Sequence, residues 1–432
     1  MMSITMATLL ILLLLVGLLP TRLPLAFLTG LIALGFAWFN FGIPGITLLT
    51  SRTYSFLTQY VFIAVPMFVF MAAILDRSGI ARDLFRAMRM LSGRLRGGVA
   101  VQTLLVSLVL ASMSGIIGGE IVLLGILALP QMLNMGYDKK LAIGTVLAGG
   151  SLGTMMPPSI VLIVYGMTSN VPISDLFIGS VTPTLLLVAM YAAYILYRSN
   201  FTVGAAPVPL ADEISKEEQW GIVRSILFPL MVAASVLGSI YAGVASVTES
   251  ACVGVAGMLI ATWTRSELSV ELLKGALQQT LSTCGMIIWI GVGATLLIGV
   301  YNLMGGVHFV KSLILSLDVT PVFIIIFMML ILIVLGMFLD WVGITLLTMP
   351  IFVPIIVSLG YDPVWFGVLF CLNMQISYLS PPFGPAIFYL KSVSPPGVTL
   401  GDMFSSVWPF ICLQILALAL LITFPQIVLW VI

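Results

Sequence analysis

Long apolar runs separated by short polar breaks make up most of the chain. A helix needs about 20 apolar residues to cross the hydrocarbon core of a bilayer, whereas strands of a membrane barrel would alternate over about ten residues. Because the runs do not alternate, the pattern predicts an all-α polytopic membrane protein. We expect spanning helices at 4–20, 24–42, 55–75, 141–166, 182–198, 224–242, 247–264, 279–300, 363–390 and 404–431.

The first apolar run, Met1 to Leu19, has the apolar character of a signal peptide. No basic region precedes it, and the apolar pattern resumes directly after Arg22 and Pro24. We therefore interpret it as the first membrane helix.

Two further stretches, 98–134 and 320–358, are apolar at both ends and interrupted in the middle by small or polar residues. The interruptions are Ser112–Glu120 and Gly336–Gly343. We interpret each stretch as a re-entrant helical hairpin, which enters and leaves the membrane on one side. The alternative is a pair of plain spanning helices in each place.

The composition supports the membrane assignment. Hydrophobic residues make up 61% of the 432 positions and charged residues only 8%, against about a quarter in soluble domains. The mean hydropathy is +1.21. These values exclude a water-soluble enzyme, a nucleic-acid-binding protein and a disordered protein, and they imply a lipid bilayer as the surroundings.

The basic residues predict an orientation. If the N terminus is periplasmic and both hairpins are re-entrant, all of the 17 basic residues except Arg52 and Lys311 fall in cytoplasmic loops, as the positive-inside rule requires. The arginines from Arg77 to Arg96 would form one such loop and anchor the topology. Two full crossings at either hairpin would leave this count unchanged, so charge does not decide between the two interpretations.

The two halves of the chain share residues at a single offset of 224 positions. Pro130 corresponds to Pro354, Gly136-Tyr137-Asp138 to Gly360-Tyr361-Asp362, Pro157-Pro158 to Pro381-Pro382, and Tyr165 to Tyr389. The first half crosses the membrane five times in this layout, so the second half would be inverted relative to the first. Inverted repeats with broken helices are typical of secondary transporters.

These observations divide the chain into two inverted repeats, 1–199 and 223–432. Between them, residues 200–222 are polar and contain Pro207 and Pro209, so we expect a cytoplasmic linker. The first repeat contains the hairpin 98–134 and a broken helix at 141–166, and the second contains the hairpin 320–358 and a broken helix at 363–390.

The two broken helices are predicted from their tandem prolines. Gly149–Ser159 and Ser380–Pro385 cannot be regular helix, because proline removes a donor and restricts the residue before it. In a membrane, such irregular backbone is tolerated only where it is buried in protein or lines a cavity. The freed carbonyl groups are candidate sodium ligands, together with the hydroxyl groups of Ser151, Thr154, Ser159, Ser377 and Ser380. The N termini of the half-helices would favour an anionic substrate.

Three acids lie within apolar segments or at hairpin tips: Glu120, Asp340 and Glu249. A charge at membrane depth costs at least about 2.5–3.5 kcal/mol on insertion scales, so it is usually functional and paired. Glu120 and Asp340 stand at the two hairpin breaks, where a cation site, proton coupling and a structural role are all open. For Glu249 we expect a helix-capping role rather than an ion site.

The remaining candidate residues carry no catalytic or metal chemistry. Cys252, Cys284, Cys371 and Cys412 lie singly in apolar segments, and we expect small buried hydrophobes. His308, the single histidine, is expected on the surface, in an outside loop. No serine–histidine or metal-ligand constellation lies in the membrane segments, so an enzyme is not expected, nor a cofactor. The broken-helix hairpins also favour alternating access over a passive channel.

The motifs resemble the large membrane subunit of tripartite ATP-independent periplasmic (TRAP) transporters over nearly the whole chain. The matching stretches are Val65–Met71, Pro130 with Gly136–Asp138, Leu152–Ser159 with Tyr165-Gly166, Gly336–Asp340, and Leu379–Gly384. The resemblance implies an elevator mechanism, with both hairpins and both broken helices in the moving domain. It also implies sodium coupling, a separate small membrane subunit of about four helices, and a periplasmic binding protein that delivers a small organic acid across a bacterial inner membrane.

The broken-helix argument and the resemblance together give a set of candidate site residues. The first sodium site would contain Ser114, Gly115, Glu120, Gly149, Ser151, Thr154 and Pro157, and the second would contain Gly336, Asp340, Ser377, Ser380 and Pro381. Candidate substrate contacts are Ser159, Gly118, Gly119, Gly343 and Gly384. No metal other than sodium is expected.

One departure from the family pattern concerns the first hairpin tip. The family commonly has Ser-Gly-Ser-Ser there with a threonine four residues further on, whereas this chain has Ser114-Gly115-Ile116-Ile117 with Glu120 at the threonine position. Two hydroxyl groups are lost and a carboxylate is gained. The alternative functional hypothesis is therefore a proton-coupled or stand-alone carboxylate carrier of a related inverted-repeat family.

Overall fold

The computed structural model of the chain is all-helical over the residues that it describes, which are 3–18, 23–91, 95–115, 117–207, 216–316 and 319–432. Arg22, Arg94 and the middle of the predicted linker lie outside the described residues. Within the described part, seven helices are long and apolar enough to cross a membrane by length and composition. This agrees with the predicted multi-pass membrane protein.

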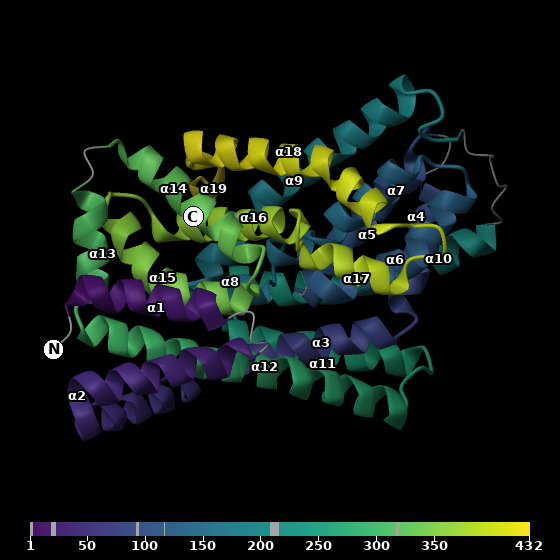
Figure 1. The fold of residues 1–432 in the computed structure, drawn as a ribbon. Coiled ribbons are helices and arrows are strands. Elements are labelled where there is room, and N and C mark those ends of the chain that lie inside the picture. The colour runs from purple at the N-terminus through teal and green to yellow at the C-terminus, as the bar shows by residue number, and fades with distance from the viewer. Residues whose placement is uncertain (1–2, 19–22, 92–94, 116, 208–215, 317–318) are drawn as a thin grey trace.

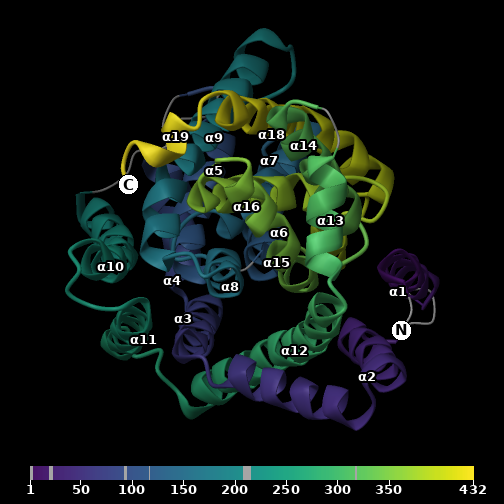
Figure 2. The same ribbon diagram turned by 90° about the vertical axis from the view of Figure 1, so that its left-hand side faces the viewer.

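An outer layer of six helices curves around one side of the molecule in Figure 2. It consists of α1 (Ile4–Leu18), α2 (Leu25–Leu57), α3 (Ala64–Arg77), α10 (Lys216–Tyr241), α11 (Val247–Thr264) and α12 (Val270–Leu303). α12 packs along α2 and α3, and α11 packs against α3 and α10.

The long helix α2 is kinked at Gly42, whose φ of 62° is outside the helical range. Pro44 then stands at the start of the second arm, where its missing N–H breaks no helical hydrogen bond. The predicted span 24–42 therefore ends at the kink, but the prediction of a loop at 43–54 is wrong. A short 3-10 turn, Tyr60–Ile63, connects α2 to α3.

An inner bundle holds the predicted hairpins and broken helices (Figure 1). Its helices are α5 (Gly98–Ser114), α6 (Ile117–Asn134), α7 (Lys139–Gly150), α8 (Ile160–Ser169), α14 (Pro321–Gly336), α15 (Trp341–Ser358), α16 (Pro363–Leu379) and α17 (Pro385–Val393). α9 (Ile173–Phe201) and α18 (Leu400–Thr423) flank it. α7 and α16 form its centre, and every described side chain of α16 from Val364 to Leu379 is buried.

The two halves of the inner bundle repeat each other in structure as in sequence. The bounds of α15, Trp341 and Ser358, lie 224 residues after those of α6. Asp138 and Asp362 cap α7 and α16 by accepting from backbone N–H groups of Leu141 and Val364. Each half also packs its second half-helix against the hairpin of the other half: α17 packs on α6, and α8 packs on α15.

The predicted breaks lie where the helices end. In the first hairpin α5 ends at Ser114, directly before Gly115, and α6 begins at Ile117, whereas the arms of the second, α14 and α15, are separated by residues 337–340. α7 is separated from α8 by a 3-10 turn at Leu152–Thr154 and the tandem proline, and α16 from α17 by residues 380–384. Re-entry into a membrane, as opposed to a full crossing, stays a prediction.

Several other predictions are corrected. The predicted loops 77–97 and 301–319 contain α4 (Ile80–Leu91) and α13 (Gly306–Leu315), so the exposed His308 lies on a helix rather than in a loop. α9 and α12 begin nine residues earlier than predicted. α18 ends at Thr423 and a short α19 (Gln426–Leu429) follows, because Pro425 cannot continue the helix. Cys252 and Cys412 are exposed, whereas Cys284 and Cys371 are buried as predicted.

Candidate functional site

The tip of the first hairpin reaches the break of the first broken helix. α5 ends at Ser114, and Gly115 turns the chain with a φ of 59°. A Cβ at Gly115 would lie 2.5 Å from the carbonyl oxygen of Pro158 and 3.4 Å from the Cα of Ser159. Only glycine allows this approach, because the positive φ and the neighbouring backbone both exclude a side chain.

Glu120 is the buried acid of this tip. It lies in the first turn of α6, is 1% exposed, and accepts a hydrogen bond at Oε1 from the hydroxyl of Ser114. Its Oε2 has no hydrogen-bond partner within the described part of the chain. Gly153 provides the room for the carboxyl group, since a Cβ there would lie 2.8 Å from Oε1. A buried oxygen without a partner costs free energy, which a cation or a proton at Oε2 would offset.

The hydroxyl groups around this break are fully buried and point their hydrogens at backbone carbonyl groups. Ser151 donates to Ala148 O at 2.8 Å, Thr154 to Ser151 O at 3.0 Å, and Ser159 to Thr154 O at 2.6 Å. Ser159 also caps α8 by accepting from the Leu162 N–H at 3.5 Å. Each hydroxyl oxygen therefore keeps at least one lone pair that can accept or bind a cation.

The structure brings only part of the predicted first sodium site to the acid. Ser114 hydrogen-bonds the acid and Gly115 approaches the Pro158 carbonyl group, whereas Gly149 faces the side chain of Ser107 in α5. Pro157 precedes the proline that meets Gly115. The participation of these residues in ion binding stays a prediction.

Asp340, the acid of the second hairpin, has partners for both carboxylate oxygens. It is the N-cap of α15, where Oδ2 accepts from the Val342 N–H at 3.1 Å. The hydroxyl of Tyr378 donates to Oδ1 at 2.8 Å. Two donors and a position at a helix N terminus stabilise the ionised form of this carboxyl group.

The rest of the second break resembles the first in its close packing. A Cβ at Gly336 would lie 2.4 Å from the Cβ of Ser377, whose hydroxyl donates to Asn373 O at 3.0 Å. Ser380 donates to Ile376 O at 2.7 Å and directly precedes Pro381. Ser377 and Gly336 thus meet, whereas Asp340 faces Tyr378.

Sequence reasoning missed Asn373 at this break. Its amide nitrogen donates to Met329 O at 3.1 Å, while its Oδ1 is buried without a partner among the described residues. Asn373 lies one helical turn before Ser377 on the same face. A polar residue with that spacing in an apolar segment was a usable signal.

The predicted substrate residues do not gather at one place. A Cβ at Gly118 would lie 3.3 Å from the ring of Tyr389. Gly384 is the N-cap of α17. Gly119 contacts the carboxylate of Asp76 in α3, because a Cβ there would lie 2.9 Å from Oδ2. Gly343 faces Leu25 of α2, so the structure does not bring it to the others.

Asp76 and Tyr389 are further residues that sequence reasoning missed. Gln279 of α12 donates to Asp76 Oδ2 at 3.5 Å and accepts from Arg77, which ties the end of α3 to α12. Asp76 was hidden at the end of a predicted span. Tyr389 was identified only as a repeat match to Tyr165, yet Tyr165 is buried and donates to Pro363 O at 2.6 Å, whereas Tyr389 is half exposed.

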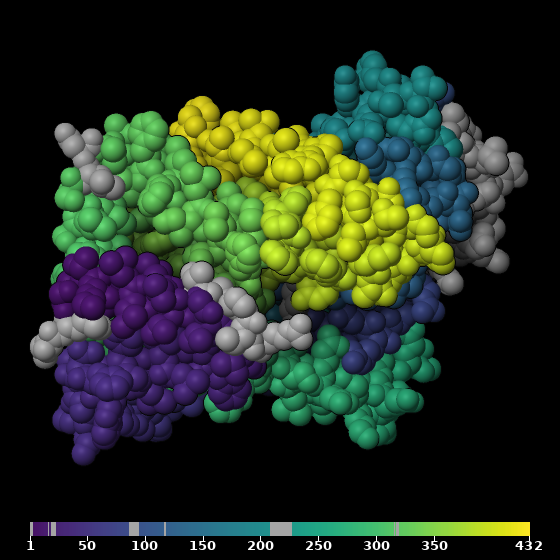
Figure 3. Space-filling view, in the orientation of Figure 1, coloured from purple at the N-terminus to yellow at the C-terminus, as the bar shows by residue number. Residues whose placement is uncertain are grey.

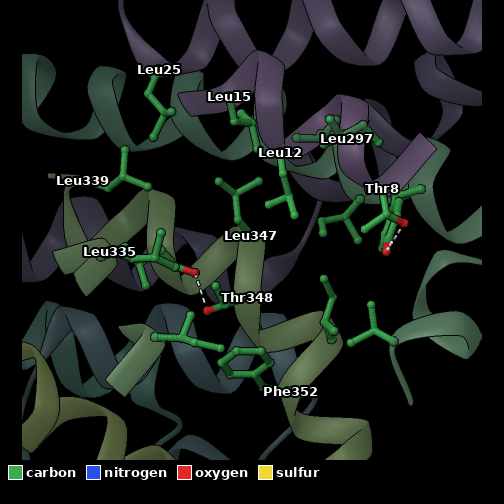
Figure 4. A pocket seen from close by; sticks show the side chains of 17 residues that line it. Thr8, Leu12, Leu15, Leu25, Leu297, Leu335, Leu339, Leu347, Thr348 and Phe352 are labelled. Atoms are coloured by element: carbon green, nitrogen blue, oxygen red, sulfur yellow. Dashed lines mark hydrogen bonds between the residues drawn. The ribbon is translucent and has the colours of Figure 1, made fainter. Parts of the chain in front are cut away.

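Several cavities adjoin the second hairpin. One, of about 350 Å³, lies between α1, α12, α14 and α15 and is lined mainly by leucine and isoleucine side chains (Figure 4). Its hydroxyl groups are already bonded, Thr8 to Tyr301 at 3.0 Å and Thr348 to Ile344 O at 2.7 Å. A second, of about 760 Å³, is lined by Asp340, Tyr378 and Tyr389 among others. A third cavity, of about 250 Å³, lies beside α15 and is lined by Arg52, Gln59 and Asn302 among others. The second and third cavities thus offer groups that can orient a polar solute.

Glu249 has the predicted capping role. The Ser246 hydroxyl accepts from the Glu249 N–H, and the Glu249 carboxylate accepts from the Ser246 N–H at 2.7 Å. This capping box at the start of α11 satisfies the carboxyl group locally.

Comparisons with known proteins agree with this architecture. The family described as tripartite ATP-independent periplasmic transporter, DctM component, matches residues 12–427. The chain is 27% identical to the C4-dicarboxylate TRAP transporter large permease protein DctM of Pseudomonas aeruginosa and 30% identical to the ectoine TRAP transporter large permease protein TeaC of Halomonas elongata, with 85% of each chain covered. The YdaH transporter of Alcanivorax borkumensis has a similar fold, with a TM-score of 0.62 at 13% identity over 88% of either chain.

Proposed function

The chain belongs to the DctM family of TRAP transporters and is a large permease subunit, and from this premise we propose that it imports a small organic acid together with Na⁺ by an elevator mechanism. It is a multi-pass membrane transporter component rather than an enzyme. The proposal concerns the coupling ion, the mechanism and the class of substrate.

The observation that carries sodium coupling is the unpartnered Oε2 of Glu120. A carboxylate that is 1% exposed at the tip of a hairpin is stable in ionised form only with a positive partner, and no basic side chain of the described residues forms an ion pair with it. Oxygen ligands suit a hard cation such as Na⁺. We propose that the ion binds between Glu120, Ser114 and the hydroxyl-lined break.

The second proposed ion site uses the corresponding break of the other half. The proposed ligands are the unpartnered Oδ1 of Asn373, the hydroxyl of Ser377, and backbone carbonyl groups at the end of α14 near Gly336. An amide oxygen, a hydroxyl and freed carbonyl groups are neutral ligands. This site therefore needs no additional buried charge to hold a monovalent cation.

The arrangement of the helices supports an elevator. The inner bundle contains both hairpins and both broken helices, and its exchange of halves, α17 on α6 and α8 on α15, is what two repeats related by a two-fold axis would produce. The outer layer would form the stationary scaffold. Asp76 of that layer contacts the hairpin tip at Gly119, so we infer that this contact breaks when the bundle moves.

The family description implies a tripartite system. We propose a separate small membrane subunit of about four helices beside the outer layer, and a periplasmic binding protein that delivers the substrate. The N terminus would be periplasmic in a bacterial inner membrane, in agreement with the distribution of basic residues.

The test is thermal unfolding of the purified chain against increasing Na⁺ at constant ionic strength, with K⁺ and choline as controls. A ligand that binds only the folded state stabilises it by about 2.7 kcal/mol at a hundred times its Kd. We expect stabilisation by Na⁺ that Glu120→Gln removes. Glu271→Gln, which changes an exposed acid in the first turn of α12, should retain it.

A repeat of the titration at several pH values tests the alternative of proton coupling. A proton on Glu120 would satisfy the same oxygen as Na⁺. An unfolding temperature that is independent of Na⁺, and that depends on pH in the wild type but not in Glu120→Gln, would replace Na⁺ by a proton as the coupling ion in the proposal.

A further inference from the structure

The cavity of about 760 Å³ between the second hairpin and the second broken helix has an unusual lining. Asp340 and the aromatic side chains of Phe338, Tyr378, Phe383, Phe388 and Tyr389 form most of it, with Met337, Leu339 and Pro385 completing the set. Its volume lies within the roughly 300–1,000 Å³ range of small-molecule sites. We propose that this cavity binds the transported substrate, and that the substrate is an organic acid that also carries a cationic nitrogen.

Aromatic faces around a carboxylate select a cation. The negative faces of aromatic rings attract ammonium groups, and cages of such rings bind quaternary ammonium ligands. Phe338 and Phe383 both line the cavity, with ring centroids 5.4 Å apart. The described residues that line the cavity include an acid and no base. A dicarboxylate would face Asp340 without a compensating charge, whereas an ammonium group would be attracted.

Two hydrogen bonds fix the position of the Asp340 carboxylate at this cavity. The Val342 N–H and the Tyr378 hydroxyl each donate to one carboxylate oxygen and leave further lone pairs free. These donors favour the ionised carboxyl group and fix its orientation. Because the α15 N terminus and Tyr378 fix the carboxylate, its second role as a cation receptor requires no rearrangement.

The start of α17 suits a carboxylate. α17 begins at Pro385, which lines the cavity, and its nine residues present a helix N terminus to the space. Pro385 has no N–H, and the Ile387 N–H donates to Gly384 O at 3.0 Å, so the Ala386 N–H is the donor of the first turn that is left for a solute. A substrate with one carboxylate and one cationic nitrogen therefore matches the cavity lining, with the nitrogen at Asp340 and the carboxylate at the start of α17.

The cavity also connects the two hairpins. Tyr389, which lines it, lies on Gly118 of the first hairpin tip. In Figure 3, α17 lies on the face that is shown, beside the second hairpin, and the cavity side chains Phe338, Phe383 and Phe388 are each about half exposed. A substrate held by Asp340 and Tyr389 would therefore contact the moving parts of both halves.

This inference rests on the proposed function and specifies its substrate. The experiment uses pairs of compounds that share a carboxylate and a shape and differ only in the cationic nitrogen: glycine betaine with tert-butylacetate, and γ-aminobutyrate with valerate. Succinate serves as the dicarboxylate. Each is titrated into the purified chain with Na⁺ present, and its apparent Kd is obtained from the concentration dependence of the unfolding temperature.

We expect the cationic member of at least one pair to bind roughly tenfold more tightly than its neutral isostere and than succinate. Asp340→Asn should abolish this preference, because asparagine retains the helix cap and the acceptor for Tyr378 but not the charge. Phe383→Leu should weaken it, whereas Phe323→Leu, at an exposed position of α14, should not.

The inference is overturned if the neutral isosteres or succinate bind as tightly as the cationic compounds, or if none of the five compounds stabilises the chain. The Na⁺ titration without organic compounds is read separately. Stabilisation by Na⁺ with a preference for succinate would leave the proposed function standing without the cationic nitrogen. Binding of a cationic compound without any Na⁺ effect would refute sodium coupling alone.

Discussion

The two hairpin breaks lie at corresponding places in the repeat but hold their acids differently. The residue 224 positions after Glu120 is Ile344, and the residue 224 positions before Asp340 is Ile116. Glu120 thus lies one turn inside α6, where one oxygen has no partner, whereas Asp340 caps α15 with both oxygens bonded. The repeat maintains the second arm of each hairpin, α6 and α15, whereas the chemistry of each break has diverged.

The positions opposite the acids changed with them. Gly153 makes room for the Glu120 carboxylate, and its counterpart in the second half is Ser377, which packs near Ile344 and against Gly336. In the first half, the glycine at this contact is Gly153 of the broken helix, which faces Glu120 of the hairpin. In the second half it is Gly336 of the hairpin, which faces Ser377 of the broken helix. This division agrees with an ion at the first break and a charged end of a solute at the second.

The largest expected effect comes from Gly115→Ala. Its Cβ would lie 2.5 Å from a backbone oxygen, and alanine would be held at a φ of 59°. The strain of a left-handed residue and the overpacking together should lower the free energy of unfolding by about 3 kcal/mol. The counterpart, Leu339, already carries a side chain, so the second tip has no such requirement. Equilibrium unfolding in mild detergent measures the loss.

Gly136→Ala and its counterpart Gly360→Ala separate the two causes. Both glycines have positive φ, 87° and 82°, but nothing lies within 4 Å of a Cβ at either. We expect about 1 kcal/mol for each, from strain alone. If Gly115→Ala lowers the free energy of unfolding no more than these two substitutions do, the close contact between the hairpin tip and the start of α8 is contradicted.

A smaller effect should appear in a double-mutant cycle that converts the first break into the second. Gly153→Ser alone would press against Glu120 and cost about 2 kcal/mol. Combined with Glu120→Ile, it recreates the pair Ser377–Ile344, so the two changes should couple favourably by about 1 kcal/mol in the free energy of unfolding without Na⁺. Additive effects would show that Gly153 does not make room for the acid.

Much of the fold could be predicted from the sequence because its strongest signals are local. Tandem prolines and the repeated Gly-Tyr-Asp turn impose backbone constraints on their own neighbours, so the breaks and the starts of α7 and α16 fell where predicted. Helices such as the second arm of α2 and α13 are shorter than a membrane span. Hydropathy therefore gave them no signal, and they were expected to be loops.

The candidate site was less predictable, because its contacts join distant segments. Glu120 and Asp340 were identified as isolated charges, but the partner of Asp340 is Tyr378, and Gly119 meets Asp76 of α3. No spacing along the chain predicts either pair. The divergence of Tyr165 and Tyr389 shows the same limit, since matching letters in the repeat have different surroundings.

The smallest expected effect tests whether the two helix caps have diverged as well. Asp138 accepts from the Leu141 N–H and forms a half-exposed ion pair with Arg198 at 3.0 Å. Asp362 accepts from the Val364 N–H at 2.6 Å and has no ion pair within the described residues. Asparagine retains both caps, so Asp138→Asn should cost about 0.5 kcal/mol more than Asp362→Asn.

Salt distinguishes this ion pair from the caps. Exposed pairs are screened at high ionic strength, where the Debye length falls to about 3 Å at 1 M, so the excess cost of Asp138→Asn should vanish there while any cost shared by both variants remains. Arg198→Gln supplies the control, because in its background the two asparagine variants should cost the same at every salt concentration. An excess that persists in high salt would place the difference in the capping geometry, and the two halves would then differ in the turn that the repeat has kept.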